Sequence, residues 1–279
     1  MSKVGRDRRE NISNVLLRVP IFAYAVVTVS LPAVALFLCF VTAVIFRYDE
    51  INDTQCNVTN FVPSISAVTG IRPQTYLWKI CIALHSAPRF AVAVIYYNYY
   101  KDLLYLVSDK YKGLFGFLMT VNFWFNTIED ASLVGVTYIS NKDNYPVHEK
   151  IFIVFMVLSL CYMLLNTILY YWTRTGKLSE DEKKSLKWKV AMFIANFTAT
   201  MGLLAFFIQH RFYCKPLAFS WFSVCEYIIG YTNMAYHLSA YYEFQNMSLA
   251  FGRLEPPHTN GSVASNNNSI TNNNKKKDQ

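Results

Sequence analysis

The sequence predicts an all-α, polytopic integral membrane protein: a six-helix transmembrane bundle with a polar interior. Composition is the first reason, because hydrophobic residues make up 53% of the chain and charged residues only 16%. The second is that several apolar runs exceed the roughly 18 residues that mark a transmembrane helix. The third is that the segments between these runs are short, which leaves no room for a separate soluble domain.

The first apolar run, residues 21–46, follows a basic N-terminal tail that covers residues 1–20. The run is longer than a signal-peptide core of roughly 7–15 residues, so we expect an uncleaved anchor. The transmembrane domain covers residues 21–244, and its spans are expected at about 21–46, 77–98, 114–139, 151–172, 189–209 and 217–242. Residues 245–279 are rich in Asn and Lys, and we expect a disordered cytosolic tail there.

Lysine and arginine residues are distributed unevenly about the expected spans. The side that holds both termini carries 18 of them, with Lys189 counted in its loop, and the opposite side carries seven. Because cytoplasmic segments carry the excess of Lys and Arg, both termini are expected in the cytosol. This topology accounts for the net charge of +8, and no nucleic-acid partner is expected. Lys276 and Lys277 resemble a dilysine retrieval signal, with a solvated charge run as the alternative.

The first loop on the expected luminal side, residues 47–76, carries N-glycosylation sequons at Asn52 and Asn57. Topology makes both accessible to luminal glycosylation, and chance occurrence of such short triplets is the alternative. Of the six cysteines, only Cys56 and Cys214 lie in luminal loops. An oxidising compartment preserves disulfides, so we expect these two to be bonded, with two free thiols as the alternative.

Three expected spans carry polar and ionisable side chains at helical spacing. His85 and Arg89 are four residues apart and share one face of the second span. At a rise of ~1.5 Å per residue, His85, Glu129 and Glu226 lie roughly 12–15 Å below the luminal ends of their spans. Ionisable groups at this depth are costly, and a functional role is the default expectation. Interhelical hydrogen bonding is the alternative, although such contacts average only ~0.6 kcal/mol.

The chemistry of the side chains divides these candidates into two groups. Three residues are candidates for acid–base catalysis: His85, Glu129 and Glu226. Six are candidates for binding a lipid headgroup: Arg89, Asn126, Asp130, Asn233, His237 and His148. No catalytic motif settles whether the protein is an enzyme. The histidines have no short His-x-x-x-His spacing, so neither a metal nor another cofactor is expected.

Four short motifs stand in a distinctive order: Cys56-Asn57-Val58-Thr59-Asn60-Phe61, His85-Ser86-Ala87-Pro88-Arg89-Phe90, His148-Glu149 and Thr232-Asn233-Met234-Ala235-Tyr236-His237. Their combination resembles the post-GPI-attachment-to-proteins factor 2 family, within the wider Frag/DRAM/Sfk group, over roughly residues 15–245. The resemblance implies a Golgi or endoplasmic reticulum membrane protein that acts in lipid remodelling of glycosylphosphatidylinositol (GPI) anchors. Asp130 departs from the pattern, in which an uncharged amide is expected, and this weakens any role given to it.

In that family the step is associated with fatty-acid replacement on the lyso-GPI, which supports stable surface expression of GPI-anchored proteins. The resemblance therefore implies a GPI phospholipid of the luminal leaflet as partner. Two other functions stay open. One is a non-catalytic scaffold that presents lipid to a separate membrane acyltransferase. The other is a small lipid transporter or scramblase, against which stands the lack of an evident inverted repeat.

Overall fold

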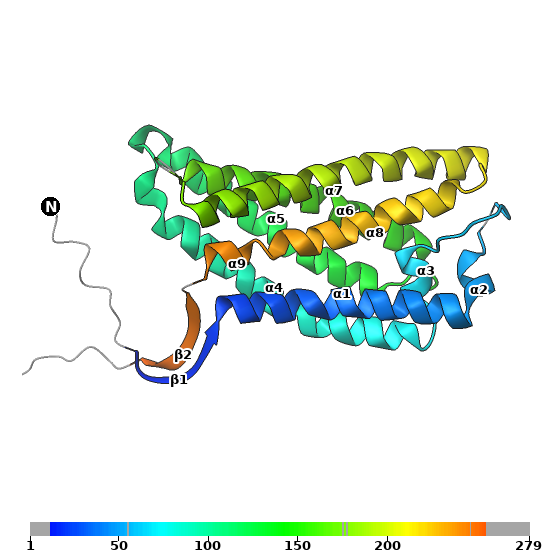
Figure 1. Cartoon of the computed structure of the whole chain (residues 1–279), viewed down its shortest axis with the longest axis horizontal. Coiled ribbons are helices and arrows are strands. Elements are labelled where there is room, and N and C mark those ends of the chain that lie inside the picture. The colour runs from blue at the N-terminus through cyan, green and yellow to red at the C-terminus, as the bar shows by residue number, and fades with distance from the viewer. Residues whose placement is uncertain (1–11, 55, 175, 177, 246, 255–279) are drawn as a thin grey trace, which may run out of the picture. The chain divides into compact units, whose positions relative to one another are not determined.

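The computed structural model describes residues 12–254 except 55, 175, 177 and 246. This part of the chain contains six helices of 20 residues or more (Figure 1). They are α1 (Ile21–Phe46), α4 (Gln74–Asp102), α5 (Lys112–Tyr138), α6 (Tyr145–Trp172), α7 (Glu180–Tyr213) and α8 (Ala218–His237). Each coincides with or overlaps one of the expected spans, so the all-α prediction is confirmed for these helices.

Shorter elements connect and flank the long helices. They are α2 (Tyr48–Asn52), α3 (Ile65–Thr69), the 3-10 turns η2 (Leu104–Leu106) and η3 (Asp109–Tyr111), α9 (Ala240–Glu243), β1 (Ile12–Pro20) and β2 (Ser248–Leu254). The chain divides into two units, and the larger one, Val19–Leu249, holds every helix of the described residues. The described residues of the smaller unit are 12–18 and 250–254.

The two strands differ from the sequence interpretation, which placed residues 12–20 in a basic tail and 248–254 in a disordered one. β1 and β2 pair with each other in a two-stranded sheet. Each strand has a few apolar residues, such as Val15-Leu16-Leu17 in β1, within a polar surrounding sequence. Runs this short give no spanning signal, and strand pairing over such a sequence distance has no local signature. The remaining tail residues, with Lys276 and Lys277, lie outside the described residues.

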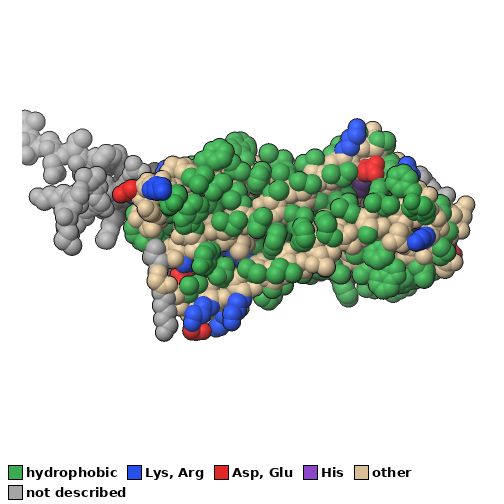
Figure 2. Space-filling model, turned by 90° about the horizontal axis from the view of Figure 1, so that it is seen from above, with side chains coloured by type: hydrophobic (Ala, Val, Ile, Leu, Met, Phe, Trp, Pro, Cys, Tyr) green, Lys and Arg blue, Asp and Glu red, His purple; other side chains and the backbone are tan. Residues whose placement is uncertain are grey.

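Four of the long helices are long and apolar enough to cross a membrane, and they make the chain a multi-pass membrane protein. They are Ile21–Phe46, Gln74–Leu106 (which includes η2), Tyr145–Trp172 and Glu180–Tyr213. α5 and α8 are also long, but their buried faces carry polar and acidic residues, which lowers their average apolarity. In the face drawn in Figure 2, hydrophobic side chains cover much of the helical surface, as lipid contact requires.

α7 begins well before the apolar run that predicted it. Ser179 and Glu182 form a capping box, in which the Glu182 amide donates to Ser179 Oγ at 3.3 Å and the Ser179 amide donates to Glu182 Oε2 at 2.9 Å. Three acidic residues in the first turn complement the helix dipole. A capped polar turn therefore extends the helix outside the segment that hydropathy identifies.

One consequence is that Lys189 lies within α7 and is fully buried, whereas the sequence analysis placed it in a cytosolic loop. Its Nζ forms an ion pair with Glu243 Oε1 at 3.0 Å. The ammonium also lies 4.7 Å from the centroid of the Tyr236 ring, and the Tyr96 and Tyr170 rings are close by. Lys189 therefore joins α7 to α9, and it cannot be counted among the loop residues that indicate which side of the membrane is cytosolic. The excess of Lys and Arg on the side of the termini remains large without it.

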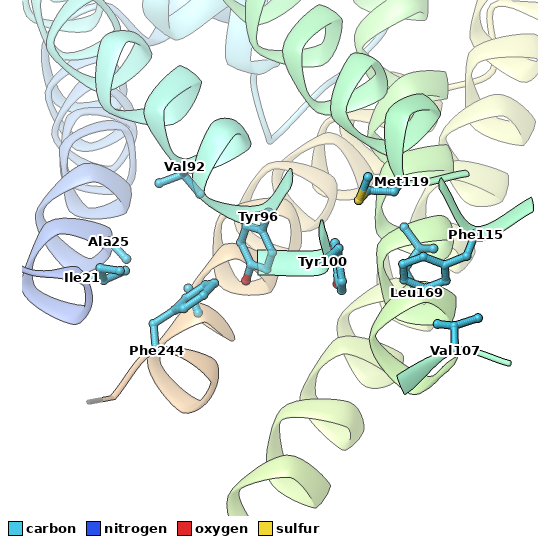
Figure 3. Close-up of a cluster of buried hydrophobic side chains, with 11 residues drawn as sticks. Ile21, Ala25, Val92, Tyr96, Tyr100, Val107, Phe115, Met119, Leu169 and Phe244 are labelled. Atoms are coloured by element: carbon cyan, nitrogen blue, oxygen red, sulfur yellow. The ribbon is translucent and has the colours of Figure 1, made fainter. Parts of the chain in front are cut away.

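A closed aromatic core fills the same end of the helical unit (Figure 3). Tyr96 and Tyr100 of α4 pack with Phe115 of α5 and with Phe244, which follows α9. Tyr96 and Phe244 meet edge to face, with ring centroids 5.1 Å apart. The Tyr100 hydroxyl is fully buried and donates to Asn166 Oδ1 at 2.7 Å. The cavities described below lie toward the other ends of these helices.

Candidate functional site

A buried ion pair between α4 and α5 lies at the centre of the polar interior. Arg89 Nη2 is 3.3 Å from Glu129 Oε2 and donates to Asn126 Oδ1 at 3.2 Å. The two charged side chains are only 4% and 1% exposed. Asn126 and Glu129 are three residues apart on α5, so a single guanidinium reaches both. The permanent cation inside the membrane thus has the acidic partner that its depth requires.

Asn233 extends this network to a third and a fourth helix. Its Nδ2 donates to Glu129 Oε1 at 2.7 Å and to Ser159 Oγ of α6 at 2.6 Å. Glu129 is therefore held by α4 through one oxygen and by α8 through the other. All of these groups are buried, so each hydrogen bond avoids the cost of an unsatisfied polar atom in a dry interior.

His85 makes its hydrogen bond to a backbone group, not to a carboxylate. Its Nδ1 lies 2.7 Å from the carbonyl oxygen of Thr28 in α1, and the side chain is 2% exposed. A carbonyl only accepts, so Nδ1 carries the proton in this bond and Nε2 is left as an acceptor. This fixes the tautomer and the ring orientation in the way that a supported catalytic or metal-binding histidine requires.

Glu226 is likewise held by the backbone. Its Oε2 accepts from the amide of Ile65 at the start of α3, at 2.8 Å. Residues 61 and 62, just before this turn, donate their amides to Ser220 Oγ, at 2.7 and 3.2 Å. The first inter-helix loop is therefore fixed to α8 at two points, one of them Glu226.

Two neighbouring cavities occupy this end of the helical unit. The first holds about 100 Å³ and is lined by His85, Glu226, Asn233 and His148 among mainly apolar side chains. The second holds about 350 Å³, and only it falls within the size range of small-molecule sites. Ser66, His148, Phe152 and Glu226 line both cavities, so the two meet along these side chains.

The other predicted headgroup-binding residues are placed in three different surroundings. His148 Nδ1 donates to the carbonyl oxygen of Ile139 at 2.8 Å, and the side chain lines both cavities. Asp130 is 2% exposed, and neither of its carboxylate oxygens has a hydrogen-bond partner among the described residues. His237 stacks on Tyr162, with ring centroids 5.5 Å apart, and lines neither cavity.

Six of the nine predicted residues form two groups, and the other three have the separate surroundings just described. Arg89, Asn126, Glu129 and Asn233 form one hydrogen-bonded network. His85 and Glu226 line the first cavity, and each is held by a different backbone group. No hydrogen bond joins His85 to either glutamate in the described part of the chain. The acid–base couple suggested by their equal depth is therefore not made by direct contact in this structure.

The loops at this end are joined covalently. The structure bonds Cys56 to Cys214, the pair favoured by the sequence, with their Cα atoms 5.5 Å apart. Asn57 is exposed, and Asn52 is partly exposed and donates to the carbonyl of Tyr48 at 3.0 Å. In the same region Lys142 hydrogen-bonds to Glu50, which lowers the pKa of that carboxyl group. Both sequons thus lie on the side of the disulfide, and their use stays a prediction.

Several site residues were not singled out by the sequence. Ser159 and the Thr28 carbonyl complete the polar interior, and Ser220 fixes the first loop. A serine in a membrane helix usually packs or bonds to its own backbone, and a carbonyl acceptor has no sequence signature. The described residues contain no group of three or more His, Cys, Asp or Glu side chains that could hold a metal ion.

Membrane-crossing helices around a polar interior with cavities define a multi-pass membrane protein with an intramembrane polar site. Comparison with known proteins gives the family. Residues 21–247 match the family model described as the Frag1/DRAM/Sfk1/Cwh43P N-terminal domain. The chain belongs to the post-GPI attachment to proteins factor 2 family within this group, which confirms the resemblance seen in the sequence.

Three relatives illustrate the match. "Post-GPI attachment to proteins factor 2-like" of Drosophila melanogaster is 50% identical over 220 residues, covering 78% of this chain and 68% of that protein. "Acyltransferase PGAP2" of Xenopus tropicalis is 36% identical over 250 residues, covering 89% and 96%. "Post-GPI attachment to proteins factor 2" of Drosophila melanogaster is 32% identical over 245 residues, covering 87% and 93%. No solved structure matches the chain.

Proposed function

We propose that this protein acts in the lipid remodelling of GPI anchors after their attachment to protein, by replacing a fatty acid on the lyso-anchor. Relatives that align over most of the chain are named for a step after GPI attachment, and two are named acyltransferases. The observation that carries the proposal is the first cavity, where His85, Glu226 and Asn233 come together among apolar walls inside a membrane protein. At about 100 Å³ this cavity has room for the reacting ester group of an amphiphile and not for the whole molecule.

The proposed reaction uses His85 as the general base. The free hydroxyl of the lyso-anchor attacks the carbonyl carbon of an acyl ester in a donor lipid, and His85 Nε2 takes the hydroxyl proton. A new ester bond forms, the donor alkoxide leaves, and it receives the proton back from His85. The hydrogen bond from Nδ1 to the Thr28 carbonyl orients the ring for this role. Asn233, held by Glu129 and Ser159, is the neighbouring polar group in the cavity wall.

The topology proposed for this function has six spans and both termini in the cytosol. All six long helices then cross the bilayer, including α5 and α8, whose polar faces are turned inward and are joined by the hydrogen bond from Asn233 to Glu129. The cavities and the Cys56–Cys214 bond lie at the luminal end, next to the leaflet that holds GPI lipid. The Golgi or the endoplasmic reticulum membrane is the proposed location.

A non-catalytic role has one specific observation in its favour. Arg89 and Glu129 neutralise each other in a closed network, and His85 has no carboxylate partner among the described residues. A protein that presents the lyso-anchor to a separate membrane acyltransferase would need the cavity but no base. Loss of His85 distinguishes the two functions.

The test is His85→Gln in cells that lack this activity, with protein abundance and surface GPI-anchored protein measured together. The substitution keeps hydrogen-bonding capacity and removes the imidazole base. We expect normal abundance and failure to restore surface display. Ser86→Ala is the matched control, because Ser86 is the adjacent residue and bonds only to the carbonyl of Ile82 in its own helix, at 2.7 Å. Full rescue by His85→Gln would remove the catalytic function and favour lipid presentation.

A further inference from the structure

The second cavity has a division of polar and apolar lining that the reaction above does not use. Its outer part is lined by loop and helix-end residues that include Asp53, Tyr145, Glu149 and Arg211. Its inner part is lined by side chains of three helices: Phe152, Ile153 and Met156 of α6, Leu203, Leu204 and Phe207 of α7, and Phe219 and Phe222 of α8. A polar mouth above an apolar interior matches a molecule with a polar head and one hydrocarbon chain.

The wall between α6 and α7 is the thin side of this cavity. Ile153 of α6 and Leu204 of α7 line the cavity, and these residues are 49% and 45% exposed. Met156 and Leu203, behind them, are nearly fully buried and belong to the inner apolar cluster. Since α6 and α7 both have the length and apolarity of membrane spans, the outside of this wall faces lipid hydrocarbon. The cavity is thus one side chain away from the bilayer interior.

The inner end of the cavity leads to the site residues. Glu226 and His148 line both cavities, so an occupant of the second would have one part next to the residues around His85. An aromatic wall follows the other side, where Phe219 stacks on Phe222 with ring centroids 5.4 Å apart and Phe222 contacts Phe207 at 6.1 Å. Rigid aromatic and aliphatic walls limit how much chain can be accommodated.

We propose that the second cavity is an acyl-chain subsite, which admits a single chain of a phospholipid laterally between Ile153 and Leu204 and places its ester near Glu226 and His148. This inference rests on the proposed function, since it supplies the chain that remodelling installs. The occupant is a membrane phospholipid, because the apolar part of the cavity is lined by two helices that can span the membrane, and the polar mouth holds both Arg211 and acidic residues, as a zwitterionic headgroup requires. Free fatty acid, which lacks that headgroup, competes poorly.

The first experiment is photolabelling of the full-length protein in vesicles of phosphatidylcholine that carries a diazirine near the end of one chain. Mass spectrometry should map the label to α6 and α7 peptides that contain Met156 and Leu203. Leu204→Trp fills the lateral opening and should lower this labelling at least about tenfold, the weakening expected when about two methylenes no longer fit. Met201→Trp is the matched control, because Met201 is also 45% exposed on α7 but does not line the cavity.

A second pair repeats the test from the other helix. Ile153→Trp should reduce labelling as Leu204→Trp does, and Val157→Trp, at a lipid-facing position one turn along α6, should not. Equal labelling in a variant and its control, or label spread evenly over all lipid-facing helices, would overturn the subsite. Displacement of the label by free fatty acid as readily as by phosphatidylcholine would overturn the phospholipid assignment.

Labelling needs no GPI substrate, so failure of the proposed function is seen separately from failure of the subsite. If His85→Gln restores surface display while Leu204→Trp still abolishes labelling, catalysis is refuted and the subsite stands. If remodelling is lost in His85→Gln but Leu204→Trp labels normally and installs chains of unchanged length, the subsite is refuted and the proposed function stands.

Discussion

Replacing both charges of the buried Arg89–Glu129 pair should destabilise the protein by less than the sum of the two single replacements. The two charges lie 3.3 Å apart and are less than 5% exposed. At an effective dielectric constant of ~20, this separation corresponds to an attraction of about 5 kcal/mol, which desolvation partly offsets. Removal of one partner leaves the other charge buried and unpaired, at a cost of about 3–5 kcal/mol. Arg89→Met and Glu129→Gln should each show a loss of this size.

The double variant tests this reasoning, because it leaves no unpaired charge. Its loss should be smaller than the sum of the single losses, with a coupling free energy of about 2–3 kcal/mol. Unfolding by SDS in mixed micelles measures all four proteins of the cycle. Ser132→Ala, at another buried site on α5 where the hydroxyl bonds only to its own helix, measures the sensitivity of the helix to a neutral change. Additive losses in the cycle would show that the pair does not interact.

Three further predictions concern other parts of the chain. Lys189→Met should lower protein abundance, because it leaves Glu243 buried and unpaired. Adding Glu243→Gln to the same protein should restore most of that abundance. Equal abundance of the single and double variants would refute the pairing. Cys56→Ala should destabilise the protein by about 2–5 kcal/mol, which immunoblots would show as a lower protein level. In the wild-type protein, recovery of the Cys56 peptide alkylated without prior reduction would contradict the disulfide. If the first inter-helix loop is luminal, removal of both Asn52 and Asn57 should abolish any mobility shift on endoglycosidase treatment. Protease protection in sealed microsomes tests the other end of the chain, and a protected C-terminal tag would refute the six-span topology.

The positions of the long helices were predictable because each apolar run extends over the length of a membrane span and so gives a clear hydropathy signal. The apolar run from residue 21 to 46 predicted α1 with the same bounds. Helix ends were less predictable, since caps and polar turns decide them: Ser179 starts α7 inside a charged segment, and this misplaced Lys189. The strands β1 and β2 were missed because their pairing depends on segments at opposite ends of the sequence.

The sequence predicted which ionisable residues lie in the site, but it did not predict the hydrogen-bond partners of His85 and Glu226. A permanent cation such as Arg89 inside a span needs an anion, and Glu129 is the one that the structure supplies. His85 and Glu226 bind the backbone carbonyl of Thr28 and the backbone amide of Ile65. Nearly every residue carries both groups, so the sequence could not distinguish this acceptor and this donor from others. The cavities are lined by side chains from several helices and loops, and no single segment of the sequence records that arrangement.

The most direct test of the account is acyl transfer by the purified protein. The protein in nanodiscs is given a lyso-GPI lipid and phosphatidylcholine with a labelled chain, and the labelled diacyl product is measured. The account predicts transfer by the wild type and by Ser86→Ala, and none by His85→Gln at equal folding. No transfer by the folded wild-type protein with this donor, together with full cellular rescue by His85→Gln, would contradict a catalytic role for the cavity.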